Sequence, residues 1–358
     1  MSIFWNKRTR SISPYVAGEQ PKDRRFIKLN TNENPYPPAP GVIAAIHAEL
    51  NDGDALRLYP DPGCVAFRQA VSAYTGQPVA HIFASNGSDE ALAFACAAFF
   101  DTDGAPVRFP DITYSFYPVY MGLYDIPYET IPLDADFRID IQDYLQQQEM
   151  GGMLLSNPNA PTAVAMPLSE VEQLAQALLR HNRVLVVDEA YAEFGAETAL
   201  PLVDKYPNVL IVHTLSKDRS LAGMRLTYAI GQRHLIEGLE RIRDSFNSYV
   251  LDRLAIAAGI AAMGESAYYQ QVNGQVQVTR DAFVSTLQSM SFVVLPSAAN
   301  FVFARHPQQD ARGLFDKLRE RGILVRHFKQ PRIDQFLRIS IGTEADMAQV
   351  AAVLKELL

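Results

Sequence analysis

The chain has 358 residues, of which 48% are apolar and 20% are charged. This balance is ordinary for a globular protein and excludes an intrinsically disordered chain, while the length corresponds to roughly two domains. The 32 basic and 40 acidic residues give a net charge of −8. An acidic chain without a long basic stripe is a poor binder of nucleic acid.

Three further absences narrow the class of protein. The chain has only two cysteines, Cys64 and Cys96, which cannot build a disulfide framework and fit a reducing compartment. The longest apolar run, residues 91–100, is too short to cross a bilayer. No apolar stretch follows the basic residues near the N-terminus, as a signal peptide would require. We therefore expect a cytoplasmic enzyme that binds neither nucleic acid nor membranes.

In chain order, residues 1–40 are rich in proline and asparagine and are expected to form an extended arm. Residues 82–84 are predicted to form a strand, followed by a turn and an apolar helix over 90–100. Three apolar runs at 153–155, 184–187 and 209–212 lack polar alternation, which is typical of parallel strands covered on both faces. Between the first two runs, Ser169 and Glu172 predict a capping box that opens a helix. Strands and helices that alternate in this way indicate an α/β fold.

The last hundred residues have a different pattern. We expect a long helix over 266–288 and strands over 300–305 and 336–341. Between these strands, Asp310 is predicted to cap a helix that ends at Gly322. The sequence thus predicts an arm at 1–40, a large domain at 41–245 with a mixed, mostly parallel sheet between helices, and a small α+β domain at 246–358.

Several common site motifs are missing from the chain. The sequence contains no Walker A loop, no G-x-G-x-x-G after a strand and no G-x-S-x-G elbow. Its seven histidines show no paired spacing for metal ligands, so we expect no metal site.

Polar residues follow two of the predicted parallel strands. Asp188 and Tyr191 come after the run 184–187, and Lys217 comes after the run 209–212. Carboxyl ends of parallel strands share one edge of a sheet, which is where open α/β folds bind ligands. A lysine for a Schiff base and an acid for a pyridine nitrogen are the pair that pyridoxal phosphate needs. Either residue alone would more simply be a surface lysine or a strand-end aspartate.

A phosphate site is predicted at the turn after residues 82–84. The N–H groups and dipole of the helix that follows favour an anion, and Gly87 lets the backbone approach closely. Ser216 and Arg225 can add a hydroxyl and a guanidinium fork to the same phosphate. The turn alone is weak evidence, but it makes the set of lysine, acid and phosphate site complete.

These residues occur in blocks that resemble fold-type I pyridoxal phosphate aminotransferases. The similar blocks are Asn157-Pro158-Asn159-Ala160-Pro161-Thr162, Asp188-Glu189-Ala190-Tyr191 and Thr214-Leu215-Ser216-Lys217 with Arg225. The branch that the chain most resembles is histidinol-phosphate aminotransferase. That likeness runs through Leu29-Asn30-Thr31-Asn32-Glu33-Asn34-Pro35, Tyr59-Pro60-Asp61, Asn86-Gly87-Ser88-Asp89-Glu90 and Leu337-Arg338-Ile339-Ser340-Ile341-Gly342-Thr343. It covers nearly the whole chain.

The resemblance implies a role for each matching residue. Lys217 would form the Schiff base and move the proton in catalysis, Asp188 would hold the pyridine nitrogen, and Tyr191 would bind the phenolic oxygen of the cofactor. Tyr114 would stack on the ring, although a core aromatic is the simpler alternative for it. Tyr59 would reach the cofactor phosphate of a partner subunit in a homodimer. The phosphate is assigned to Gly87, Ser88, Asp89, Ser216 and Arg225, with Thr214 also in the cofactor site.

One position departs from the family pattern. The family usually has asparagine directly before Pro-Thr-Gly, where this chain has Ala160. Asn159 is expected to take over the contact with the cofactor, with Asn157 as the alternative. If neither reaches it, control of the pKa of the Schiff base is weakened.

The substrate site is placed in the C-terminal part of the chain. The resemblance implies that Arg338 clamps the acidic end of the substrate and that Arg326 adds a second fork, which marks the phosphate-handling branch. Tyr15, Asn30 and Asn300 are further expected substrate contacts. The predicted reaction is ping-pong amino transfer between histidinol phosphate and 2-oxoglutarate. Three alternatives are an aromatic amino acid aminotransferase, a phosphothreonine-type decarboxylase and a binding module without catalysis.

Overall fold

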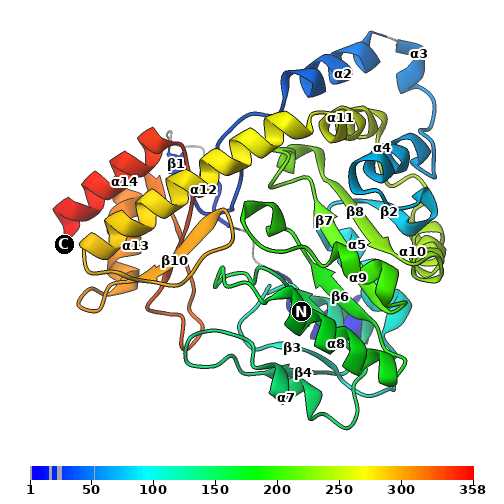
Figure 1. The fold of residues 1–358 in the computed structure, drawn as a ribbon, viewed down its shortest axis with the longest axis horizontal. Helices are drawn as coiled ribbons and strands as arrows, with labels where there is room; N and C mark the ends of the chain where they lie inside the picture. The colour runs from blue at the N-terminus through cyan, green and yellow to red at the C-terminus, as the bar shows by residue number, and fades with distance from the viewer. Residues whose placement is uncertain (1, 16–17, 22–25, 52) are drawn as a thin grey trace.

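The computed structural model describes residues 2–15, 18–21, 26–51 and 53–358, and its largest element is a seven-stranded sheet (Figure 1). The strand order is β2-β8-β7-β6-β5-β3-β4. β8 is antiparallel to both of its neighbours, and the other pairs are parallel. The mixed, mostly parallel sheet predicted from the sequence is therefore confirmed. Its strands are β2 (Ile82–Asn86), β3 (Val107–Pro110), β4 (Tyr128–Ile131), β5 (Gly152–Ser156), β6 (Leu185–Asp188), β7 (Val209–Thr214) and β8 (Leu226–Gly231).

Helices cover both faces of this sheet, so the central strands are apolar on both sides. In β6, Leu185 and Val187 pack into one core with Leu174, whereas Val186 points to the other face and packs with Leu92. This alternation follows from the two-residue period of a strand. The helices that pack around the sheet are α4 (Val65–Thr75), α5 (Ser88–Phe99), α6 (Tyr117–Tyr124), α7 (Ile141–Leu145), α8 (Leu168–Arg180), α9 (Leu200–Lys205), α10 (Arg233–Phe246) and α11 (Arg253–Gly264).

The predicted capping box at the start of α8 is wrong. The helix begins at Leu168, directly after Pro167, so Ser169 lies inside its first turn. Pro167, with an extended backbone, is the N-cap two residues before the predicted one, and its side chain forms no capping hydrogen bond. The free N–H of Leu168 instead donates to Oε2 of Glu197, from a loop distant in the sequence.

A second, four-stranded antiparallel sheet lies in the C-terminal part, in the order β12-β13-β10-β9. As predicted, Asp310 caps α13, and Gly322 follows the helix with φ +82°. The elements here are α12 (Ser266–Ser289), β9 (Val293–Val294), β10 (Phe301–Arg305), α13 (Ala311–Glu320), β11 (Ile323–Leu324), β12 (Arg326–His327), β13 (Leu337–Ser340) and α14 (Glu344–Leu357). Among the described residues, no helix combines the length and apolarity needed to cross a membrane.

The arm joins the two sheets. Its strand β1 (Ile27–Lys28) pairs with β11, and the N–H of Ser340 donates to the carbonyl of Leu29. The remaining elements are α1 (Lys7–Ser11), α2 (Pro40–Leu50), α3 (Gly53–Leu56) and the short helices η1 (Val79–His81), η2 (Ala192–Phe194) and η3 (Ala222–Met224). The long helix α12 extends from beside α11 to the C-terminal sheet (Figure 1). The division at residues 40 and 245 stays a prediction.

Candidate active site

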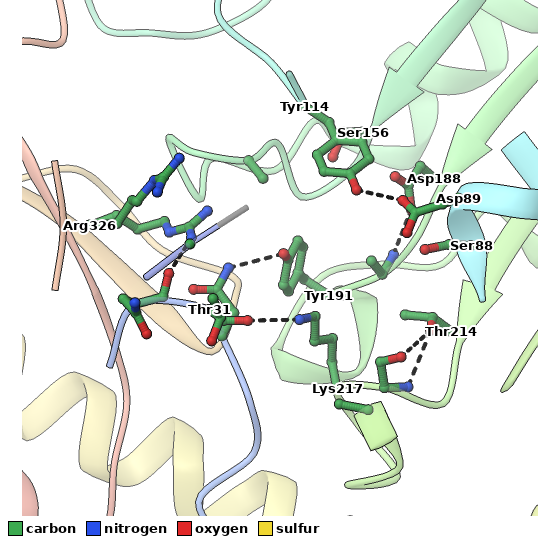
Figure 2. Close-up of a pocket in the computed structure, with 18 of the residues that line it drawn as sticks. Thr31, Ser88, Asp89, Tyr114, Ser156, Asp188, Tyr191, Thr214, Lys217 and Arg326 are labelled. Carbon is green, nitrogen blue, oxygen red and sulfur yellow. Dashed lines mark hydrogen bonds between the residues drawn. The ribbon is translucent and has the colours of Figure 1, made fainter. Parts of the chain in front are cut away.

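A cavity of about 180 Å³ lies where β5, β6 and β7 end, and it is closed by the arm and by the C-terminal sheet (Figure 2). Ser156, Asp188 and Thr214 are the last residues of the three strands, and all three line it. Most of the sequence-predicted residues meet at this cavity. They are Tyr15, Asn30, Ser88, Asp89, Tyr114, Asp188, Tyr191, Thr214, Ser216, Lys217, Arg225, Arg326 and Arg338.

Lys217 projects into the cavity from the turn after β7. Its Nζ donates to the carbonyl of Thr31 at 3.0 Å, and its own carbonyl accepts from Asn34, so the arm holds both ends of the residue. Burial lowers the pKa of Lys217 to about 8, against the opposing charge of Glu33. A large share of the amine is therefore neutral near pH 8, as a nucleophile requires.

Asp188 is buried at the end of β6, and burial raises its pKa to about 7. Its carboxylate accepts from the N–H of Ala190 at 3.2 Å and from the hydroxyl of Tyr117 at 3.5 Å. Both partners are neutral donors, so the negative charge is only partly compensated. A protonated ring nitrogen in the cavity would supply the missing positive charge, which makes Asp188 a fitting partner for a pyridine.

The predicted phosphate-binding end of the cavity lies at the N-terminus of α5. Gly87 is the N-cap with φ +83°, and a Cβ on it would lie 2.3 Å from Nη2 of Arg225. Only glycine allows both the backbone angle and this approach of the guanidinium. Ser88 and Ser216 line the same part of the cavity, and Ser216 is fixed through Thr214, whose hydroxyl lies 3.0 Å from that of Ser216. N–H groups, hydroxyls and a cation thus converge on one end.

The side chain of Asp89 makes contacts that the sequence did not predict. Its carboxylate accepts from the hydroxyls of Tyr114 at 2.7 Å and Tyr120 at 3.2 Å, and it pairs with Arg225 at 3.4 Å. A carboxylate repels a phosphate, so only the backbone N–H of Asp89 suits an anion. The side chain instead orients Tyr114 and Arg225. This was not visible in the sequence, because Tyr114 and Arg225 are distant from Asp89 along the chain.

Two arginines occupy the opposite end of the cavity. Arg338 donates to the carbonyl of Asn30 at 3.0 Å, and its buried Nε has no hydrogen-bond partner in the part of the chain that the structure describes. Burial and the charge of neighbouring Arg326 lower the pKa of Arg338, although Tyr191 opposes this. Both guanidinium groups lie against the ring of Phe328. Two like charges with a free donor form a site for an anionic group. Tyr15, stacked on Phe116 at 4.4 Å, completes this end.

Besides Gly87 at the N-terminus of α5, three predicted site residues lie away from the lining of the cavity, namely Asn159, Asn300 and Tyr59. Asn159 does not line the cavity, because its amide is engaged with the carbonyl of Ile112 and the hydroxyls of Thr113 and Thr162. Ala160 lines the wall in its place.

The alternative residue, Asn157, is likewise committed to the backbone of Met166. Asn300 is fully buried behind the cavity and donates to the carbonyl of Asn32. The predicted cofactor contact of Asn159 and the predicted substrate contact of Asn300 are therefore not supported. Tyr59 is 78% exposed, stacks on Tyr249 and lies outside the cavity of its own protomer.

The sequence did not predict the roles of Thr31 and Asn32, which contact Lys217 and Tyr191 in the cavity. The carbonyl of Thr31 holds Lys217, and the amide of Asn32 donates to the hydroxyl of Tyr191 at 3.0 Å (Figure 2). Both lie inside the Asn30–Asn34 block that was singled out for its resemblance. The cluster of asparagines there was the available signal, but it did not show which of them faces the cavity.

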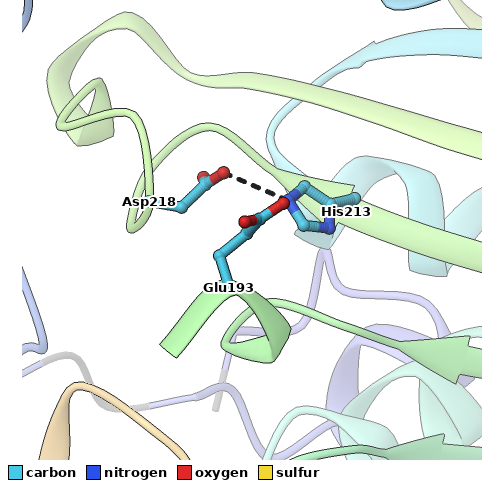
Figure 3. Close-up of side chains that lie close together, drawn as sticks. All are labelled: Glu193, His213 and Asp218. Atoms are coloured by element: carbon cyan, nitrogen blue, oxygen red, sulfur yellow. Dashed lines mark hydrogen bonds and ion pairs between the residues drawn. The ribbon is translucent and has the colours of Figure 1, made fainter. Parts of the chain in front are cut away.

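A second polar cluster lies on the opposite face of β7 from Thr214 and comprises Glu193, His213 and Asp218 (Figure 3). Asp218 lies 3.3 Å from His213 and 3.2 Å from Arg219, which is buried between the rings of Tyr74 and Tyr269. Burial lowers the pKa of His213, but the carboxylate of Asp218 outweighs it and raises that pKa. The guanidinium already neutralises Asp218, so this geometry favours an ion-pair network that braces the turn carrying Lys217 over a cation site.

Comparison with known proteins identifies the family. Residues 24–354 match Aminotransferase class I and II. The chain belongs to the class I and II aminotransferases. It is 53% identical over 358 residues to "Histidinol-phosphate aminotransferase 2" of Dechloromonas aromatica, covering 100% of this chain and 99% of the relative. It is 54% identical to "Histidinol-phosphate aminotransferase 1" of Pseudomonas aeruginosa, covering 96% of each.

Solved structures of the family have the same fold. The histidinol-phosphate aminotransferase of Sinorhizobium meliloti, solved in complex with pyridoxal 5'-phosphate, superposes with a TM-score of 0.88 at 26% identity. The match covers 100% of this chain and 99% of that one. The fold-type I aminotransferase architecture predicted from the sequence is thereby confirmed for this aminotransferase.

The low pKa of Lys217 predicts how its reactivity depends on pH. Because the amine must be neutral to react, reductive methylation of Lys217 in the cofactor-free aminotransferase should rise with pH and reach half its maximal rate near pH 8. Mass spectrometry of the peptide measures this, with the exposed Lys205 as internal control. A midpoint for Lys217 near the ordinary lysine value of about 10.4 would contradict the prediction.

Proposed function

We propose that this aminotransferase uses pyridoxal 5'-phosphate to move an amino group from histidinol phosphate to 2-oxoglutarate, in a ping-pong cycle. The observation that carries the proposal is the placement of Lys217 and Asp188 at one end of the cavity and of Arg326 and Arg338 at the other. Relatives that are about half identical over nearly the full chain are named histidinol-phosphate aminotransferases, which supports the same substrate.

The residues of the cavity fit this cofactor. Bound pyridoxal phosphate supplies an electron sink for the charge that develops at Cα of the substrate. Asp188 would keep the proton on its ring nitrogen, and Tyr191 would donate to its phenolic oxygen. Tyr114, fixed by Asp89, would stack on the ring. The N-terminus of α5 with Gly87, Ser88, Ser216 and Arg225 would hold the phosphate.

Lys217 would carry out the proton transfers of the reaction. Its neutral Nζ would accept the proton from Cα of the substrate as a general base and, once protonated, would return it as a general acid. A pKa of about 8 suits both directions near neutral pH. Thr31 keeps the amine pointed into the cavity through its carbonyl.

Arg326 and Arg338 would together bind each of the two substrates, one in each half of the cycle. The phosphate of histidinol phosphate and a carboxylate of 2-oxoglutarate are both anions that a guanidinium fork binds in two-point contact. Tyr15 and Asn30 complete this end of the cavity, and the buried Oδ1 of Asn30 has no hydrogen-bond partner among the described residues. One pair of arginines thus serves both halves of the cycle.

We further propose a cytoplasmic homodimer in which Tyr59 of each protomer reaches the cofactor phosphate of its partner. Tyr59 is exposed, as are several other apolar side chains of the kind that a protein interface covers. These side chains are Ile43, Leu50, Leu56, Leu58 and Tyr249.

A half-reaction screen tests the proposal. The enzyme carrying pyridoxal phosphate is mixed with histidinol phosphate, phenylalanine or phosphothreonine, and the loss of the visible absorbance band is followed. We expect histidinol phosphate to bleach the band at the lowest concentration. Bleaching by phenylalanine alone would favour an aromatic aminotransferase, and release of carbon dioxide from phosphothreonine would favour a decarboxylase. Either result contradicts the proposed substrate.

Arg326→Met tests the anion end of the cavity. Losing one charge-assisted contact costs about 1.5–3 kcal/mol, so kcat/KM for histidinol phosphate should fall about 10- to 150-fold. The fall should lie mainly in KM. Arg312→Met, which removes an exposed arginine paired with Asp316, is the matched control and should keep wild-type values. An unchanged KM for Arg326→Met would exclude a substrate contact.

Gly87→Ala tests the phosphate end. The new methyl group would occupy the place of the Arg225 guanidinium, so the dissociation constant of pyridoxal phosphate should rise about tenfold or more. Gly76→Ala is the control, because Gly76 has a similar φ of +76° but the added Cβ would have no atom of the described residues within 4 Å. Titration of the cofactor-free enzyme measures both. Equal losses in the two variants would mean that backbone strain alone is responsible.

A further inference from the structure

Asn32 is a buried residue of the arm that lines the active-site cavity. Its Nδ2 donates to the hydroxyl of Tyr191 at 3.0 Å. Asn32 lies between β1 and α2 and belongs to no helix or strand, so helix or strand propensity does not explain the choice of residue. The contact therefore points to a role in the site.

The backbone of Asn32 supports that role. Its φ is +57°, in the left-handed region that non-glycine residues seldom adopt. Asparagine tolerates this conformation better than most residues. A strained conformation persists only where the surroundings determine it, and such positions are concentrated at functional sites.

The C-terminal sheet determines the orientation of the amide. Oγ of Ser340 accepts from the backbone N–H of Asn32 and donates to its Oδ1, both at 2.9 Å. Nδ2 of Asn300 donates to the carbonyl of Asn32 at 2.9 Å. Because Oδ1 is fixed toward Ser340, the NH2 group must face Tyr191.

The hydrogen bond from Asn32 orients the hydroxyl proton of Tyr191. A phenol has one proton, and accepting from Asn32 leaves that proton available for an acceptor in the cavity. The donated hydrogen bond also polarises the O–H group and strengthens it as a donor. Arg338 and Asp188, which face Tyr191 as well, act on it with opposite charges.

The loop of residues 157–162 offers no side-chain donor to the cavity, so the hydroxyl of Tyr191 matters more as a donor to the cofactor. The loop that was expected to offer an asparagine amide presents Ala160, which has no side-chain donor. The amides of Asn157 and Asn159 are committed to other partners. Of the two side chains predicted to contact the phenolic oxygen of the cofactor, Tyr191 lines the cavity and the asparagine does not.

We propose that Asn32 is a positioning residue, which orients the hydroxyl of Tyr191 toward the phenolic oxygen of pyridoxal phosphate and so lowers the pKa of the nitrogen that joins the cofactor to Lys217. This rests on the proposed function. A hydrogen bond to the phenolic oxygen withdraws negative charge that would otherwise stabilise the protonated nitrogen. Ser340 and Asn300 carry the effect from the C-terminal sheet to the cofactor.

The test is a pH titration of the visible absorbance band of the enzyme carrying pyridoxal phosphate. Asn32→Gly keeps the left-handed backbone and removes the amide, so the midpoint should rise by roughly half to one pH unit. Asn182→Gly is the matched control, because Asn182 also has a left-handed backbone, with φ +54°, but is exposed and outside the cavity. Its midpoint should equal that of the wild type.

A double-mutant cycle shows whether Asn32 acts through Tyr191. Tyr191→Phe should raise the midpoint by itself, and adding Asn32→Gly to it should cause no further shift. Should Asn32→Gly fail to fold, Ser340→Ala replaces it, and we expect a smaller rise because the amide is free to rotate. A midpoint unchanged in Asn32→Gly, or a shift of equal size in the Tyr191→Phe background, would overturn the inference.

The proposed function is tested separately in the same experiment. If the wild type forms no visible band with pyridoxal phosphate, or if Lys217→Ala forms the same band, the proposed function fails and the inference fails with it. If the band depends on Lys217 but Asn32→Gly titrates like the wild type, only the inference about Asn32 is wrong.

Discussion

The partial exclusion of water from two ionisable side chains is the constraint on which this active site depends. Asp188 ends β6, and Lys217 follows the neighbouring parallel strand β7. Both side chains would be charged at neutral pH in water. Burial disfavours the charged form of each, so the pKa of the lysine falls to about 8 and that of the aspartate rises to about 7. The two groups are thereby left poised near neutrality, and a cation on the ring nitrogen would complete the pair.

This arrangement needs a rigid support, which the large sheet provides on both faces. The strands that carry Asp188 and Thr214 are fully buried and packed between two apolar cores. On the face of β7 opposite Thr214, Asp218 and Arg219 anchor the turn after Lys217 to Tyr74 of α4 and Tyr269 of α12. The turn is therefore held from behind while the amine of Lys217 remains accessible from the cavity.

The arm connects this support to the C-terminal sheet. Three consecutive residues contact three functional side chains: Asn30 holds Arg338, Thr31 holds Lys217 and Asn32 holds Tyr191. The segment is itself fixed by the pairing of β1 with β11 and by Ser340. The segment therefore connects the substrate end and the cofactor end of the cavity through hydrogen bonds to both.

The sequence by itself determined the elements and the chemistry. Unbroken apolar runs identified the buried strands, and a lysine, an aspartate and a glycine turn at strand ends identified the site, because these signals are local. The tertiary structure decided what depends on contacts between distant segments. Glu197 rather than Ser169 completes the start of α8, Asn159 turns away to Ile112, and Asn300 and Ser340 act through Asn32. Hydrogen-bond partners that are far apart along the chain leave no periodicity or spacing for a sequence to reveal.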